Sequence, residues 1–282
     1  MSAIWGSAFI AIKVSLEYFS PVSVASYRLI IASIFLLILY FIGQYKTKLS
    51  GNDLLMLIFV GIVGNFLPFY LISWSEQHIQ SSTAGILMGV GPILTLILSH
   101  FLTKDDKFNI TKLISIFIGF IGVLFIFEID SLFNLGSSNT IELLSKFLII
   151  LAALGYMISN IVAYNTLKHI DSFSITFFAT FFGALVSIPF LFYGESIKPS
   201  YFSFKSIVPI LYLGIFPTAL AFQLRYHITK TSGPVFLSYV AYLIPIFALI
   251  WGFILLSEKI YFTSIVGITF ILIGIYIGRK NQ

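Results

Sequence analysis

The sequence predicts an all-α integral membrane protein of ten transmembrane helices arranged as two inverted five-helix repeats. The first observation is composition: 59% of the residues are hydrophobic, 10% are charged and the mean hydropathy is +1.02, whereas soluble domains are about 25% charged. The second is the succession of apolar runs near bilayer length, about 20 residues for a helix. The third is an internal repeat.

Proline, glycine and charged residues divide the chain into ten apolar spans, and each span is expected to form one helix. The spans lie near residues 2–19, 22–43, 54–74, 81–102, 112–128, 147–165, 172–193, 206–226, 235–256 and 261–278.

Basic residues in the connections predict that both termini are cytoplasmic, because short cytoplasmic loops carry an excess of Lys and Arg. With the N-terminus inside, the cytoplasmic side holds Lys46, Lys48, Lys104, Lys107, Lys112, Lys168, Arg225, Lys230, Arg279 and Lys280. The outer side holds Lys146, Lys198, Lys205 and Lys259.

The repeat appears when residues 61–102 are written above residues 214–255 without a gap. This offset of 153 residues aligns Gly61 with Gly214 and Pro92 with Pro245. Residues 1–130 form the first predicted repeat, 131–146 the connecting loop and 147–282 the second repeat. Because five is odd, the second repeat enters the membrane from the opposite side, as in carriers that work by alternating access.

Several motifs carry a family resemblance that runs over nearly the whole chain. "WGSAFIAIK", "FSPVSVASYRL", "YLGIFPTALAF" and the closing "PIFALIWGFILLSEKIYFTSIVGITFILIGIYIG" resemble the EamA-type carriers of the drug/metabolite transporter superfamily. The resemblance implies an exporter of amino acids, other metabolites or drugs in a bacterial inner membrane. Arg225 departs from the family pattern, which usually has an aromatic residue there, and Ile244 replaces an acidic residue often found before the proline.

Three charged residues lie within the first two spans, where ionisable groups are costly and often functional. Lys13 and Glu17 have the i,i+4 spacing that permits contact on a helix, and Arg28 lies at a similar depth on the next helix. In one interpretation Glu17 and Arg28 form a structural ion pair while Lys13 extends towards the membrane surface. In the other, Lys13 faces a central cavity and binds an anionic group of the substrate.

Neutral polar and aromatic residues are the other predicted substrate ligands. Rings bury apolar surface and hydroxyl or amide groups fix orientation, which suits an amphipathic small molecule. The alternative is that these side chains serve helix packing. The candidates are Asn65, Tyr70, Trp74, Asn160, Tyr164, Gln223, Tyr226, Tyr239 and Tyr242.

Helix breakers at related places in the two halves predict hinges. Gly89, Gly91 and Pro92 interrupt the fourth span and Pro245 the ninth, and proline bends a helix by removing a backbone hydrogen bond. They either allow one bundle to rock against another or form a static kink.

The sequence offers no support for an enzyme, a cofactor or a metal site. Cysteine is absent, and the four histidines are isolated, so no metal-ligand spacing occurs. Basic residues are scattered singly, which argues against a nucleic-acid partner.

We therefore expect a secondary transporter of a small polar or amphipathic metabolite, with an amino acid or derivative favoured and export as the direction. Its partners are the substrate, the lipid bilayer and either a proton or an exchanged counter-substrate. A multidrug exporter of lipophilic cations and an organic-anion exchanger are the alternatives.

Overall fold

The computed structural model describes residues 1–126, 140–192, 203–256 and 261–279. In this part of the chain every regular element is a helix and no strand occurs. The elements are α1 (Ser2–Leu16), α2 (Pro21–Ile42), α3 (Gly51–Gly61), η1 (Ile62–Phe66), α4 (Leu67–Ser75), α5 (Ser81–Met88), α6 (Gly91–Leu102), α7 (Ile110–Ile126), α9 (Thr140–Thr166), α10 (Ser172–Leu191), α11 (Phe204–Leu213), η4 (Gly214–Leu220), α12 (Ala221–Leu256) and α13 (Phe262–Arg279).

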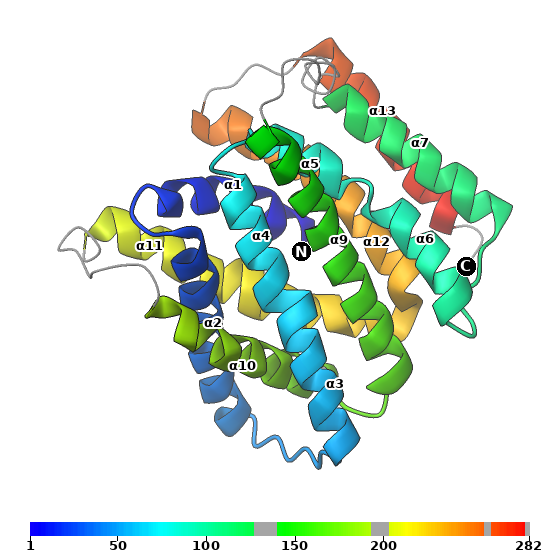
Figure 1. Ribbon diagram of the computed structural model, residues 1–282. Helices are drawn as coiled ribbons and strands as arrows, with labels where there is room; N and C mark the ends of the chain where they lie inside the picture. Colours follow the sequence, from blue (N-terminus) through cyan, green and yellow to red (C-terminus); the bar gives the residue numbers. More distant parts are fainter. Residues whose placement is uncertain (127–139, 193–202, 257–260, 280–282) are drawn as a thin grey trace.

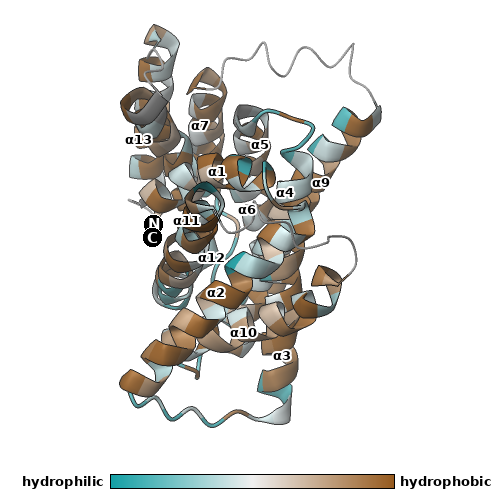
Figure 2. Cartoon of the chain, turned by 90° about the vertical axis from the view of Figure 1, so that its left-hand side faces the viewer, coloured by the Kyte–Doolittle hydropathy of each residue, from teal (hydrophilic) through white to brown (hydrophobic). Residues whose placement is uncertain are grey.

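The helices have the length and surface of membrane spans. Within the described residues, six helical segments are long and apolar enough to cross a bilayer, and Ser2–Leu16, Ile110–Ile126 and Phe262–Gly278 are shorter apolar helices. Large apolar side chains such as Phe101 and Phe192 are exposed, and brown covers most of α2, α3 and α10 in Figure 2 while teal gathers in the connection between α2 and α3. The described part of the chain is therefore all-helical, and its long apolar helices agree with the integral membrane protein that the sequence predicts.

Short polar residues at the connections determine where several helices begin. Ser20 accepts a hydrogen bond from the N–H of Ser23, and Pro21 occupies the first turn of α2. Ser50 and Asp53 form a reciprocal capping box at α3, and Asp171 caps α10. These side chains satisfy N–H groups that have no partner within the helix.

Two predicted boundaries differ from the structure. The predicted eighth span, 206–226, ends too early, because its helix continues to a kink at Gly233, a residue with φ +83°, beyond which the predicted ninth span forms a second helix within α12. Glycine adopts this left-handed backbone without steric cost. The predicted connecting loop 131–146 is helical from Thr140 onward, because "TIELLSK" contains good helix formers, and residues 131–139 lie outside the described part.

The predicted hinges also differ between the two halves. α5 ends at Met88 and α6 begins at Gly91, and the two residues between them, Gly89 and Val90, keep right-handed helical backbone angles. Pro245 lies inside α12, where the non-helical residue is Gly233. Gly233 marks the kink between two successive helices, and the backbone around Pro245 stays helical.

Two π-helical segments lie at related positions of the chain. η1 spans Ile62–Phe66 and η4 spans Gly214–Leu220. Subtracting the offset of 153 from 214–220 gives 61–67, which contains η1. π-helical turns occur frequently at functional sites.

Glycines bring several helices into close contact. Figure 1 shows α7 and α13 side by side, and a Cβ at Gly122 would lie 2.6 Å from the carbonyl oxygen of Gly267. The η1 segment approaches α9 in the same way, since a Cβ at Gly155 would lie 2.6 Å from the carbonyl oxygen of Val63. Small residues allow such backbone approach between membrane helices.

Candidate functional site

A cavity of about 120 Å³ lies among the helices of both halves of the chain. Helices α1, α2, α4 and α5 line it from the first half, and α9 and α12 from the second. Among the described lining residues none is acidic. The lining residues are Trp5, Ala8, Phe9, Ile12, Arg28, Phe69, Ile72, Met88, Tyr156, Met157, Asn160, Phe222, Arg225, Leu237, Ser238, Ala241 and Ile244.

Arg225 reaches the cavity from α12 and is held by neutral groups. Its Nε donates to Asn160 Oδ1 at 2.6 Å, and Nη2 donates to Ser159 Oγ at 2.8 Å. The carbonyl oxygens of Gly64 and Tyr156 accept weaker bonds at 3.3 and 3.4 Å. The side chain is 2% exposed. These partners fix the position of the guanidinium but do not neutralise its charge.

Arg28 places a second guanidinium at the cavity from α2. Its Nε donates to Thr218 Oγ1 at 3.0 Å, and its Cζ lies 3.6 Å from the centroid of the Phe69 ring. None of the ion pairs found within the described residues includes Arg28 or Arg225. Two buried cations thus line one cavity with no carboxylate in direct contact, which is costly for a protein unless an anion binds there.

Aromatic side chains form the apolar wall of the cavity. The rings of Phe69 and Phe222 lie 5.6 Å apart, and Trp5 meets Phe222 edge to face at 6.2 Å. Trp5 Nε1 donates to the carbonyl oxygen of Pro217 at 2.9 Å. The indole is therefore held against the η4 segment, and the rings offer an apolar surface to the body of a ligand.

Glu76 is a buried carboxylate close to this site. It follows the last residue of α4, is 5% exposed, and neither of its oxygens has a hydrogen-bond partner within the described residues. Lys13 and Arg28 interact with it electrostatically. Glu76 is thus an acidic group whose charge acts on Arg28, although Glu76 is not part of the cavity wall.

The structure places the charged residues of α1 and α2 differently from the predicted arrangement. Lys13 and Glu17 are exposed and outside the cavity lining. No ion pair joins Glu17 to Arg28 in the described part of the chain, since Arg28 contacts Thr218 and Phe69 instead. The physical reason is that Arg28 faces the bundle interior while α1 ends at Leu16, before Glu17.

Of the neutral candidates, Asn160 lies in the cavity wall, whereas the others are placed elsewhere. Gln223 accepts from Thr176, and Tyr164 donates to Asp105. The hydroxyls of Tyr239 and Tyr242 bond to Ser115 and to the carbonyl oxygen of Ile116 on α7. The remaining candidates outside the lining are Asn65, Tyr70, Trp74 and Tyr226.

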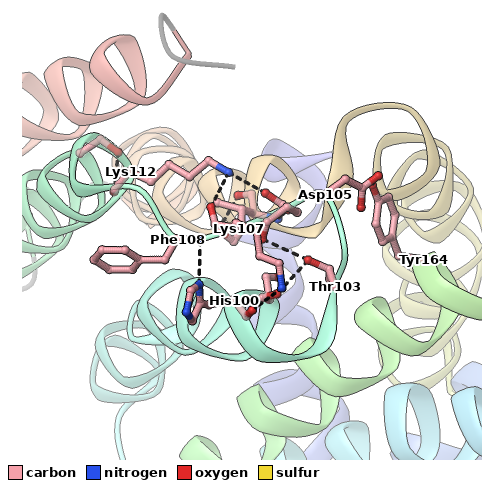
Figure 3. A network of polar contacts seen from close by, with 12 residues as sticks. His100, Thr103, Asp105, Lys107, Phe108, Lys112 and Tyr164 are labelled. Carbon is pink, nitrogen blue, oxygen red and sulfur yellow. Dashed lines mark hydrogen bonds and ion pairs between the residues drawn. The ribbon is translucent and has the colours of Figure 1, made fainter.

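Polar contacts join the two halves at one end of the bundle, around the connection between α6 and α7 (Figure 3). Tyr164 donates to Asp105 at 2.8 Å, which holds the pKa of that carboxyl below its ordinary value. Asp106 accepts from Lys112 at 2.7 Å and from the N–H of Val235 at 2.9 Å. Asp106 therefore caps the part of α12 that follows Gly233.

Sequence reasoning missed two important residues. The predicted span ending near residue 226 puts Arg225 at a cytoplasmic helix end, although no strong helix breaker occurs between residue 226 and Gly233. Helix continuation to that breaker was the signal that would have placed Arg225 inside the membrane. Glu76 follows the predicted third span, and burial at a helix end has no signal in the sequence alone.

Comparisons with known proteins agree on one family. The model of the EamA-like transporter family matches residues 1–128 and 143–278. Two Bacillus subtilis proteins named uncharacterized transporters are similar: YetK is 31% identical, covering 99% of this chain and 85% of its own, and YoaV is 24% identical, covering 99% and 94%. An uncharacterized transporter of Archaeoglobus fulgidus is 27% identical, covering 99% and 95%.

A solved crystal structure shows the same fold, with a TM-score of 0.78 at 14% identity over 99% of this chain and 94% of the other. With both segments of the chain matched by one family model, the resemblance seen in the sequence is confirmed. The chain belongs to the EamA-like transporter family and is a membrane transporter.

Proposed function

We propose that the protein is a secondary transporter that exports a small amphipathic carboxylate, an amino acid or an amino acid derivative, across a bacterial cytoplasmic membrane. The observation that carries this proposal is the pair of buried guanidinium groups, Arg28 and Arg225, in one cavity with no acid among its described lining residues. Export is the direction that the resemblance to metabolite exporters favours.

The chemistry of the lining selects the substrate class. A guanidinium binds a carboxylate through charge-assisted hydrogen bonds, which are stronger than those between neutral groups. The rings of Trp5, Phe69 and Phe222 receive an apolar body. Because no lining carboxylate is available for an ammonium group, an amino acid derivative with an uncharged nitrogen fits better than a free amino acid.

The two alternatives are affected differently by this geometry. A lipophilic cation entering the cavity meets two buried positive charges, so a multidrug exporter of that type is disfavoured. An organic-anion exchanger remains compatible, but its cations are Arg28 and Arg225 rather than Lys13. The coupling partner in either case is a proton or an exchanged counter-substrate.

The architecture we propose is ten transmembrane helices in two inverted five-helix repeats, residues 1–130 and 147–282, with both termini in the cytoplasm. The related positions of η1 and η4 and the separate family matches in the two halves support it. In alternating access one half rocks against the other. The contacts of Asp105 with Tyr164 and of Asp53 with His169, at 2.8 and 3.1 Å, join the halves at the cytoplasmic end.

Counterflow in proteoliposomes tests the substrate class. Vesicles loaded with N-acetyl-L-leucine, L-leucine or tetraphenylphosphonium are diluted into a trace of the same labelled compound. We expect accumulation of N-acetyl-L-leucine, weaker accumulation of L-leucine and none of the cation. Exchange of tetraphenylphosphonium alone would assign the protein to the lipophilic-cation class instead.

A further inference from the structure

Glu76 is a buried ionisable group that the substrate site does not use. It stands at the C-terminal end of α4, the helix that supplies Phe69 and Ile72 to the cavity. Its two oxygens are buried and have no hydrogen-bond partner among the described residues. An ionised carboxylate in such a place is costly, and the partial negative charge at a helix C-terminus adds to that cost. Both effects favour the protonated acid.

Charged groups from two neighbouring helices act in the opposite direction. Lys13 on α1 and Arg28 on α2 interact electrostatically with Glu76 and favour its ionised form. On α9, which packs along α4, Lys146 is paired with Glu142 at 2.6 Å. His78, two residues beyond Glu76, is exposed and contacts Trp74. The protonation of Glu76 therefore depends mainly on the two cations, one of which belongs to the substrate site.

We propose that Glu76 is a proton-binding site coupled to the substrate site, so that one proton binds to Glu76 when a carboxylate binds to Arg28. This inference rests on the proposed function of the cavity. An anion at Arg28 neutralises a charge that stabilises ionised Glu76, so its arrival favours uptake of a proton by the Glu76 carboxylate. By linkage the effect is reciprocal, and protonated Glu76 strengthens binding of the anion.

The direction in which the pKa of Glu76 is shifted agrees with this proposal. Glu76 is the first residue after the apolar segment Gly51–Ser75, and burial raises its pKa above the ordinary value for glutamate, against the opposing influence of Lys13 and Arg28. A raised pKa brings the titration of this group towards the neutral range, where a proton can be gained and lost during a transport cycle.

The pH dependence of substrate affinity tests the coupling. Binding of N-acetyl-L-leucine to wild type and Glu76→Gln is measured between about pH 6 and about pH 9. We expect wild-type affinity to weaken about tenfold with rising pH, within the usual range of coupling, and the affinity of Glu76→Gln to change little. The matched control is Glu17→Gln, which removes an exposed carboxylate and should keep the wild-type profile.

Lys13→Gln gives an independent readout of the electrostatic coupling. Removal of this cation disfavours ionised Glu76, so the midpoint of the wild-type profile should move towards alkaline pH without loss of its amplitude. A profile in Glu76→Gln that matches wild type would overturn the proposal.

Infrared spectroscopy of purified protein separates this proposal from the assignment of the cavity. The carbonyl band of a protonated carboxylic acid should be present in wild type at neutral pH, absent in Glu76→Gln, and stronger after addition of N-acetyl-L-leucine. A wild-type protein without this band contradicts the proton site. If the band is present but no probe anion exchanges or binds, the proton site stands and the proposed substrate class fails.

Discussion

At the residue scale, the proposed function depends on charges that the fold buries without pairing them directly. Arg225 and Arg28 are 2% and 4% exposed, and their hydrogen-bond partners are neutral oxygens. Hydrogen bonds satisfy the donors, but the positive charge remains available to a carboxylate. The sequence predicted Asn160 as a substrate ligand, whereas it predicted Arg28 as the partner of Glu17 in a structural ion pair. It could not identify their partners, because contacts such as Arg28 with Thr218 join residues far apart in the chain.

Asp106 offers a test of a buried ion pair at the α6–α7 connection. Asp106→Asn keeps an acceptor for the N–H of Val235 but leaves Lys112 charged and without its carboxylate. Breaking a buried pair in this way costs about 3 kcal/mol, so Tm in detergent should fall clearly. Asp105→Asn is the control, because Asp105 is exposed and exposed pairs contribute little. An equal Tm for both variants would contradict the structural role of Asp106.

At the element scale, most helices were predictable because apolar length and flanking polar residues determine them. The predicted span 22–43 agrees closely with α2, Pro21–Ile42, and 261–278 with α13, Phe262–Arg279. The π-helical segments η1 and η4 were not predictable, because they depend on how the bundle packs around each turn. The position of Arg225 in the cavity follows from that packing.

Gly122 tests the close packing of α7 against α13. Gly122→Ala places a Cβ about 2.6 Å from the carbonyl oxygen of Gly267, and overpacking of this kind costs about 1–3 kcal/mol. We expect a lower Tm in detergent. The control is Gly51→Ala at the start of α3, where a Cβ meets no atom within 4 Å; its Tm should be unchanged or slightly higher. A Gly122→Ala protein as stable as wild type would show that the helices can separate without cost.

At the scale of the whole molecule, the proposed topology places the α6–α7 connection in the cytoplasm and the connection after α4 outside. The chain contains no cysteine, so single cysteines can be labelled without background. A membrane-impermeant maleimide should label Gln77→Cys in intact cells and Lys107→Cys only after lysis. The reverse pattern would invert the proposed orientation, and labelling of both sites in intact cells would contradict the helix count.

Counterflow by an Arg28 variant tests the central claim most directly, namely that the buried arginines bind the carboxylate of the substrate. Arg28→Gln removes one charged donor, and the loss of a charge-assisted hydrogen bond, about 2 kcal/mol, corresponds to about thirtyfold weaker binding of N-acetyl-L-leucine. Lys107→Gln, which neutralises an exposed lysine in the α6–α7 connection, should exchange like wild type. Equal exchange by Arg28→Gln and wild type at limiting substrate would contradict the assignment of the cavity as a carboxylate site.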